Sequence, residues 1–439
     1  MRDTLPSPAR RTSSRAAKAL LVTCLAVVAA AVAPPTAATA ADDGLRFESH
    51  TTYQVDIGAR VVRVTLDATL TNELGPNLYF PEIGVPVLAE ATNFVATIDG
   101  RRVPVRRRAV DGVIATAIVD LDPDLLSGQT LSVRLTYDLP DLPPRTAGFT
   151  RVNEAFATFA AFSPGDEHLA SVEVLVPEAF TVEHAGEDVE TTVRDGLHVL
   201  SSGPIADPAT WQIVVAARND DGLLSRELDI DGRAIVVRAW PGDDEWVSFI
   251  EAKLRGGLPV METLIDQNWP IDEELTIIEA ASPYVYGYAG WFLPSDNTIE
   301  VGDALDAAVI FHEVSHLWFN NSWFAERWIG EAFAEVYAAA TLAALGEPPH
   351  EPRPVDVTAP GSVALAEWGQ PALTDETDRD RELYGYNTSF FVLDAVADEV
   401  GTDALRGVIA AAAQRTIAYR GDPDPEQVTQ PVDSRRLLD

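Results

Sequence analysis

Cysteine is almost missing from this chain, because Cys24 stands alone among 439 residues. A single cysteine permits neither an internal disulfide nor a thiolate-rich zinc or iron–sulfur site. Basic residues are also scarce, with 32 Lys and Arg against 68 Asp and Glu and a formal charge of −36. So acidic a chain would be repelled by phosphate backbones and anionic lipid head groups, which argues against nucleic-acid binding. Because the chain lacks a set of thiolate ligands, any bound metal must be held by histidines and carboxylates.

The chain also lacks an ordinary transmembrane run, which needs about 20 apolar residues. Its longest apolar stretch, Ala19–Ala33, has 15 residues and is followed by prolines and small residues. Five basic residues precede it: Arg2, Arg10, Arg11, Arg15 and Lys18. This pattern predicts a signal peptide over residues 1–40, cleaved after Ala40, and a secreted protein with no stable membrane insertion. An uncleaved segment would instead leave the protein at the cell surface. Cleavage would leave 67 acidic and 27 basic residues, and would remove the lone cysteine.

From about residue 45 to residue 217 the sequence has a repeat of two, which is typical of half-buried strands. Apolar positions alternate with polar ones at Val62, Val64, Leu66, Ala68 and Leu70. Tight-turn dipeptides separate such runs, at Asp99-Gly100, Asp111-Gly112 and Asp195-Gly196. We therefore predict an N-terminal antiparallel β-sandwich over residues 41–217.

Residues 218–439 have a different pattern, in which strand-like segments come first and long helix-like segments follow. A hairpin turning at Asp231-Gly232 precedes a predicted helix near Glu245–Asn268 and a strand at Leu275–Ala281. The fold class predicted for the whole chain is therefore α+β and multidomain, with a second domain over residues 218–439.

The second domain contains the motif His312-Glu313-Val314-Ser315-His316. No Gly or Pro interrupts residues 303–321, so a helix is predicted there. Two histidines four residues apart project from one helix face, where both imidazoles can share one zinc ion. Glu313 lies one step round the helix, where it can act on water without being a ligand.

A catalytic zinc takes three protein ligands and keeps one position open, so another ligand is expected nearby. The segment after the motif predicts a second helix, which begins at Trp328 and stops at Gly346. Glu331 and Glu335 lie one turn apart on it and face the same way. We favour Glu331 as the third ligand and Glu335 as an acceptor for an imidazole N–H, which would fix that ligand's tautomer.

These residues resemble a known family. His312-Glu313-x-x-His316-x-Trp318-Phe319-Asn320, followed by Trp328-Ile329-Gly330-Glu331-Ala332-Phe333-Ala334, is similar to the motifs of the gluzincin metallopeptidases, specifically the aminopeptidase N-like family. The resemblance implies a β-sandwich followed by a thermolysin-like α+β zinc-peptidase domain, a Zn²⁺ cofactor and a peptide or protein substrate. The specific motifs cover only a small part of the chain.

The chain departs from the family pattern in three ways. Only 14 residues separate His316 from Glu331, fewer than the family has, and counting alone would choose Glu335. The flanking residues favour Glu331, with the shortening in the loop 322–327. The family's G-x-M-E-N stretch, whose Glu grips the substrate amine, corresponds to Gly287–Trp291 without a carboxylate, and Glu300 is the nearest substitute. The chain ends at Asp439 without the long helical domain of large members, so a more open cleft is expected.

The resemblance also suggests an oxyanion donor. Tyr386 stands where the family has its Tyr-x-Lys-Gly segment, and Tyr384 is an alternative two residues away. The leading hypothesis is a zinc metallopeptidase, aminopeptidase or endopeptidase, with ligands His312, His316 and Glu331 and with Glu313 as general base. The alternative is an extracellular binding module with a structural or vestigial zinc site, although a structural site does not require Glu313.

Overall fold

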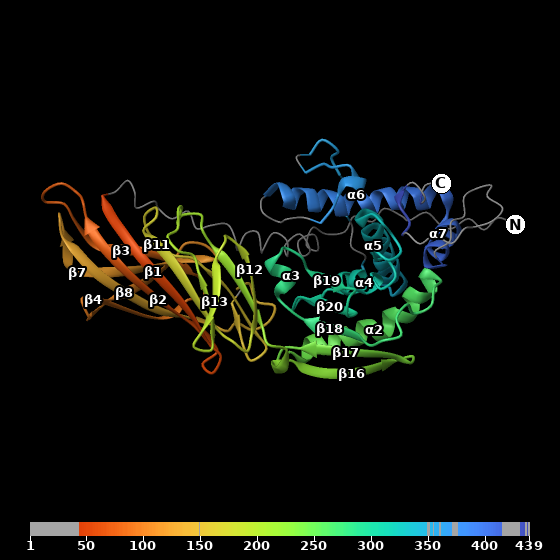
Figure 1. Cartoon of the computed structure of the whole chain (residues 1–439), viewed down its shortest axis with the longest axis horizontal. Helices are drawn as coiled ribbons and strands as arrows, with labels where there is room; N and C mark the ends of the chain where they lie inside the picture. The colour runs from red at the N-terminus through yellow and green to blue at the C-terminus, as the bar shows by residue number, and fades with distance from the viewer. Residues whose placement is uncertain are drawn as a thin grey trace.

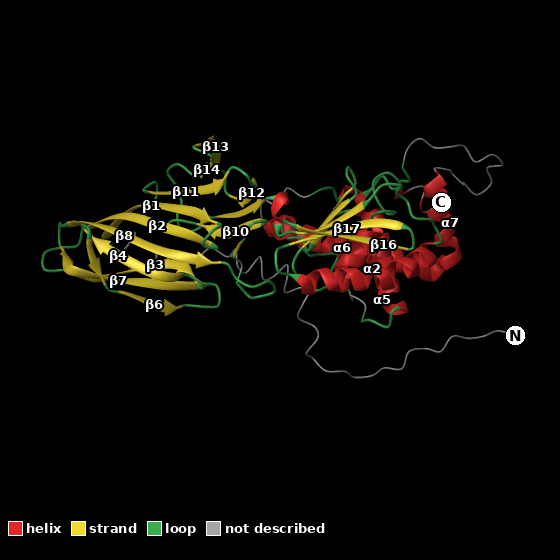
Figure 2. Ribbon diagram, turned by 90° about the horizontal axis from the view of Figure 1, so that it is seen from below, coloured by secondary structure: helices red, strands yellow, loops and turns green. Residues whose placement is uncertain are grey.

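The computed structural model describes residues 44–148, 150–348, 352–353, 355–359, 361–370, 376–414, 431–434 and 437. The predicted signal segment 1–40 lies outside these residues. The molecule is elongated, with one end built of strands and the other end built of helices and a further sheet (Figures 1 and 2). None of its described helices combines the length and the apolar character that crossing a membrane requires.

Three sheets form the first part of the chain. The largest has the order β13-β14-β11-β1-β2-β8-β4-β5, and the others have the orders β3-β7-β6 and β12-β15-β10-β9. Their bounds are β1 (Leu45–Asp56), β2 (Val61–Asn72), β3 (Tyr79–Leu88), β4 (Thr92–Ile98), β5 (Arg101–Val103), β6 (Val105–Ala109), β7 (Ile114–Leu126), β8 (Thr130–Pro140), β9 (Arg151–Val152), β10 (Phe156–Ala161), β11 (Ala170–Pro177), β12 (Thr181–Gly186), β13 (Glu190–Arg194), β14 (Leu197–Ser201) and β15 (Ile213–Arg218).

Alternating burial orients these strands. The even-numbered positions of β2 from Val62 to Leu70 are buried, as the repeat of two predicts. Buried side chains from all three sheets form one hydrophobic cluster. The pairing is not wholly antiparallel, however, because β1 and β11 run parallel, with Ser49 opposite Ala170. The strands β2 to β10 lie between β1 and β11 in the sequence, so no tight hairpin forces β1 and β11 to run in opposite directions.

The second part of the chain has a five-stranded mixed sheet in the order β16-β17-β18-β20-β19. The strands β17, β18 and β20 run parallel, and the two outer strands run antiparallel to their neighbours. The bounds are β16 (Leu224–Ile230), β17 (Arg233–Ala239), β18 (Leu275–Glu279), β19 (Gly290–Leu293), β20 (Thr298–Val301), α2 (Asp244–Ile265), α3 (Ser282–Val285), α4 (Ala307–Ser315), α5 (Arg327–Ala344), α6 (Glu376–Val400) and α7 (Thr402–Gln414), with 3₁₀ turns η2 (Asp220–Gly222) and η3 (Leu365–Glu367).

Helix packing on this sheet positions the candidate site. Ile299 and Val301 of β20 belong to the same buried cluster as Phe311 of α4 and Phe333 of α5. A Cβ on Gly257 of α2 would lie 2.1 Å from Cε1 of Phe311, so only glycine allows α4 to approach α2 this closely. The helix α6 crosses α5 on the side away from the sheet (Figure 1).

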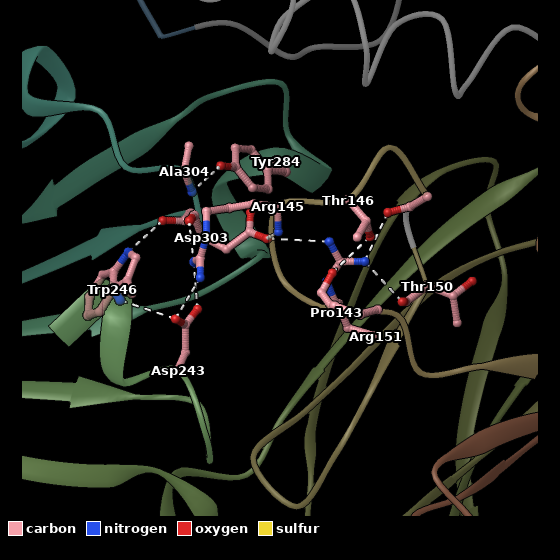
Figure 3. Close-up of polar contacts among 12 residues, drawn as sticks. Pro143, Arg145, Thr146, Thr150, Arg151, Asp243, Trp246, Tyr284, Asp303 and Ala304 are labelled. Atoms are coloured by element: carbon pink, nitrogen blue, oxygen red, sulfur yellow. Dashed lines mark hydrogen bonds and ion pairs between the residues drawn. The ribbon is translucent and has the colours of Figure 1, made fainter. Parts of the chain in front are cut away.

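Apolar and charged contacts join the two parts of the chain. Phe156 stacks on Trp240 with ring centroids 5.5 Å apart. Beside them, Arg145 makes two bonds to Asp243, from Nη1 to Oδ2 at 2.7 Å and from Nη2 to Oδ1 at 2.8 Å (Figure 3). Arg151 lies 3.3 Å from Asp303 in the same cluster of contacts. The proposed boundary between residues 217 and 218 stays a prediction.

Candidate metal centre

The motif helix α4 is shorter than the sequence predicts. It begins after Asp306, whose carboxylate accepts from the N–H of Ala308, and it ends at Ser315 instead of continuing to residue 321. Turns of the i to i−3 type replace α-helical bonds from His316 to Trp318, and the side-chain amide of Asn320 donates to the carbonyls of His316 and Leu317. His316 keeps right-handed helical dihedral angles, so it stays on the same face as His312.

Three donor atoms converge on one point. Nε2 of His312 lies 3.2 Å from Nε2 of His316 and 3.2 Å from Oε2 of Glu331, and Nε2 of His316 lies 3.4 Å from the same oxygen. The side chains are only 13–14% exposed. The structure thus brings together His312 of α4, His316 directly after α4 and Glu331 of α5, as a group that could hold a metal ion.

The other ring nitrogens show why Nε2 is the coordinating atom. His316 Nδ1 lies 2.9 Å from the carbonyl oxygen of Phe319, which only accepts, so Nδ1 carries the hydrogen. His312 Nδ1 lies 3.0 Å from Oε2 of Glu335, and this carboxylate accepts in the same way. In a neutral imidazole the lone pair then remains on Nε2, so both lone pairs are available at the convergence point.

The size of the group fits zinc. From the three distances, a point equidistant from the donor atoms lies about 1.9 Å from each, close to the zinc–ligand distances of about 2.0–2.2 Å. Nitrogen and carboxylate donors are also among those that zinc prefers. The residues present therefore fit a zinc ion held by three protein ligands.

Electrostatics favour a positive charge at the same point. Burial would raise the pKa of the Glu331 carboxyl, but His316 and His312 hold it well below its usual value. Burial would lower the pKa of His312, but hydrogen bonds with Glu331 and Glu335 raise it well above its usual value. The carboxylates thus stabilise either protonated imidazoles or, in their place, a divalent cation.

Glu313 stands beside the donor group without belonging to it. Its side chain is buried, and burial raises its pKa although His312 and His316 lower it. The first residue of β19 lies against it, because a Cβ on Gly290 would be 3.1 Å from Cγ and 3.3 Å from Oε1 of Glu313. This small residue leaves room for the carboxylate at the edge of the sheet.

The two glutamates of α5 take different positions beside the histidines. The carboxylate of Glu331 points to both Nε2 atoms, whereas that of Glu335 lies behind His312, at Nδ1. The helix α5 matches the predicted boundaries, since Leu345 follows its last residue and Gly346 has the positive φ of +74° that glycine favours.

Of the two tyrosines of α6, Tyr386 lies at the site. Its ring meets that of His312 at a centroid distance of 6.3 Å, and its Oη accepts from Nη2 of Arg327 at 3.0 Å. Residues two apart on a helix project about 200° from one another, so Tyr384 points away from this face.

The sequence reasoning missed a second group beside the donors. Arg327 and Glu382 form a buried ion pair, and Trp368 and Tyr288 donate to Glu382. A helix-spacing signal exists, because Arg327 precedes Glu331, and Glu382 precedes Tyr386, by one helical turn. Nothing local in the sequence indicates that the two turns meet.

Glu300 does not stand in for the missing amine-binding glutamate. Its neighbours Ile299 and Val301 face the core shared with α4, so Glu300 projects from the opposite face of the sheet. There it pairs with Arg218, and it accepts from Nε1 of Trp291 at 3.0 Å. The expectation that Glu300 could replace that glutamate is therefore wrong, because its carboxylate is buried on the far face.

Comparisons with known proteins give structural neighbours only. No protein-family model matches the chain, and no curated protein matches it. The solved structures that match include an M1 zinc metallopeptidase from Deinococcus radiodurans, with 17% identity, 90% of each chain covered and a TM-score of 0.35. A mutant M1 zinc metallopeptidase from the same organism, bound to a Tyr-Ser-Ala substrate, matches with 16% identity, 90% of each chain covered and a TM-score of 0.32.

Proposed function

We propose that this chain is a secreted zinc-dependent metallopeptidase that hydrolyses bonds in peptide or protein substrates. The observation that carries the proposal is the convergence of two imidazole Nε2 atoms and one carboxylate beside a buried carboxyl that is not part of the group. A metal site with a purely structural role would need the first three residues, but not Glu313.

The chemistry follows from the positions of the side chains. His312, His316 and Glu331 would hold the ion, and a bound zinc would supply a Lewis acid that polarises a carbonyl and activates water. Glu313 takes the proton from the attacking water and later gives it to the leaving amine. Tyr386 donates its phenolic hydrogen to the oxyanion of the tetrahedral intermediate.

The decisive variant is Glu313→Gln, which keeps the shape of the side chain and removes the base. We expect zinc stoichiometry to stay unchanged while kcat falls at least about a hundredfold, since a positioned base contributes about 10²- to 10⁴-fold. The exposed residue Glu273 offers a matched control, Glu273→Gln, which should keep full activity. Full hydrolysis by Glu313→Gln would contradict the proposal.

Peptide libraries with free and blocked N-termini would assign the class of peptidase. Cleavage of free N-termini only would mean exopeptidase action, and cleavage of both would mean endopeptidase action. Chelator-sensitive hydrolysis is expected in either case. Zinc binding without hydrolysis of any peptide would instead support the extracellular binding module.

Secretion has its own test. We propose that residues 1–40 act as the signal peptide and that the mature chain begins at Ala41. Mass spectrometry of the N-terminal peptide from culture medium would identify that residue. Full-length chain retained in cells would contradict this proposal.

A further inference from the structure

Arg327 is a buried cation to which the proposed chemistry assigns no part. It is the first residue of α5, and its side chain is 11% exposed. Its guanidinium donates from Nη1 to Oε1 and from Nη2 to Oε2 of Glu382, at 2.8 and 2.7 Å. The same Nη2 donates to Oη of Tyr386 at 3.0 Å. Such a bidentate pair fixes both the position and the plane of the guanidinium.

The carboxylate of Glu382 is itself held rigidly. Trp368 Nε1 donates to Oε1 at 2.7 Å and Tyr288 Oη donates to Oε2 at 2.8 Å, so each oxygen accepts twice. The guanidinium carbon of Arg327 also lies 4.2 Å from the centroid of the Trp368 ring. The guanidinium therefore has little freedom to move relative to α6.

The orientation of the Tyr386 hydroxyl follows from donor and acceptor chemistry. A guanidinium has only donors, so Oη of Tyr386 must accept from Arg327 and its own hydrogen must point elsewhere. Tyr386 packs between the ring of Trp368, at a centroid distance of 5.0 Å, and that of His312. The contact with Arg327 thus leaves the hydroxyl hydrogen free to bind an acceptor other than Arg327.

Arg327 also approaches a candidate ligand directly. Its Nε is buried, makes no hydrogen bond among the described residues, and lies 3.5 Å from Oε1 of Glu331. The other oxygen of Glu331 is the one that points at the imidazoles. One guanidinium thus faces both the proposed oxyanion donor and the proposed ligand.

We propose that Arg327 is a positioning residue, which holds Tyr386 with its phenolic hydrogen directed at the reacting carbonyl oxygen and polarises that hydrogen as a donor. This inference rests on the proposed peptidase function. The simpler explanation is that the Arg327–Glu382 pair only fastens α5 to α6. The two explanations differ in whether the effect of Arg327 depends on the Tyr386 hydroxyl.

The main variant is Arg327→Lys, in the full chain. Lysine keeps the charge that Glu382 needs, but one ammonium cannot reproduce the planar fork that reaches Glu382 and Tyr386 together. We expect kcat to fall about tenfold or more with KM changed less than about threefold, because the interaction acts in the transition state. Zinc stoichiometry should stay near that of the parent, and a cooperative urea transition of the metal-free protein should show that the variant is folded. Arg381→Lys, at an exposed arginine of α6, is the matched control.

A double-mutant cycle with Tyr386→Phe decides between the explanations. If Arg327 acts through the hydroxyl, Arg327→Lys should cost less than about threefold once Tyr386 is Phe. Equal losses of kcat in both backgrounds, or parallel loss of zinc, would overturn the inference and support simple fastening. Full activity of Arg327→Lys would also overturn it.

A measurement on metal-free protein tests the contact without activity. With 3-fluorotyrosine at position 386, the ¹⁹F resonance should shift in Arg327→Lys and stay unchanged in Arg381→Lys. An unchanged resonance in both would contradict the contact. If the parent protein binds zinc but cleaves no peptide, the proposed function fails and this inference fails with it. If the parent cleaves peptides and the cycle is additive, only the inference fails.

Discussion

The ion pair between the two parts of the chain makes a quantitative prediction, for the variant Arg145→Ala. The carboxylate of Asp243 is 2% exposed and receives both guanidinium bonds of Arg145. Burial would raise the pKa of Asp243, but Arg145, Glu279 and the N–H of Trp246 bring it below its usual value. The carboxylate is therefore ionised in the folded protein, and the variant leaves it without its cation.

The expected loss is about 2–3 kcal/mol of unfolding free energy. Removing one partner from a buried pair costs about 3–5 kcal/mol. The loss expected here lies at or below the bottom of that range because the Arg145 side chain is 25% exposed, so water already screens part of the interaction. Asp243 also keeps the backbone N–H of Trp246, which lies 3.1 Å from Oδ1.

Urea denaturation followed by tryptophan fluorescence measures this loss, because Trp240 and Trp246 lie beside the ion pair. The control is Arg46→Ala, which removes a pair whose side chains are 46% and 45% exposed. Exposed pairs contribute little, so this control should unfold as the parent does. Equal behaviour of Arg145→Ala and Arg46→Ala would refute the reasoning from burial.

Three further predictions concern other buried positions. Burial raises the pKa of Glu279 well above its usual value, so the contribution of this carboxyl to stability is present at low pH and lost as pH rises. Glu279→Gln should therefore gain stability relative to the parent between pH 5 and pH 8. A constant difference between the two unfolding free energies in urea would contradict this. Gly290→Ala should lower kcat about tenfold with zinc retained, because the new Cβ would displace Glu313, and unchanged kinetics would show that the carboxylate tolerates it. Glu331→Ala should lose zinc while Glu335→Ala retains most of it in equilibrium dialysis, and the reverse order would make Glu335 the ligand.

Local patterns predicted the features whose spacing lies within one element. The two imidazoles share a face because four residues advance a helix by about 400°. The end of α4 was not predicted, because no Gly or Pro marks it. At this end the side-chain amide of Asn320 donates to two backbone carbonyls. Such side-chain bonds to the backbone compete with the helical hydrogen bonds, and whether they form depends on the side-chain conformation.

Long-range pairing was beyond the sequence. The parallel contact of β1 with β11 joins strands more than a hundred residues apart, and no turn signal encodes it. The burial of Glu300 against Arg218 likewise depends on which face of β20 meets the core. The position of Glu300 in the sequence therefore could not show toward which face of the sheet its side chain projects.

The arrangement of α5 and α6 shows which contacts around the site can be predicted from the sequence. Glu331 and Tyr386 each have a charged residue one turn earlier, Arg327 and Glu382, so each helix presents its site residue and its partner on one face. Neither charge can stay buried alone, since an unpaired ion inside a protein costs several kcal/mol. The two helices therefore satisfy both charges when they cross with these turns in contact, and the same crossing brings Tyr386 against His312. The spacing within each helix can thus be predicted locally, whereas the crossing that gives it a function is selected by the need to pair the charges.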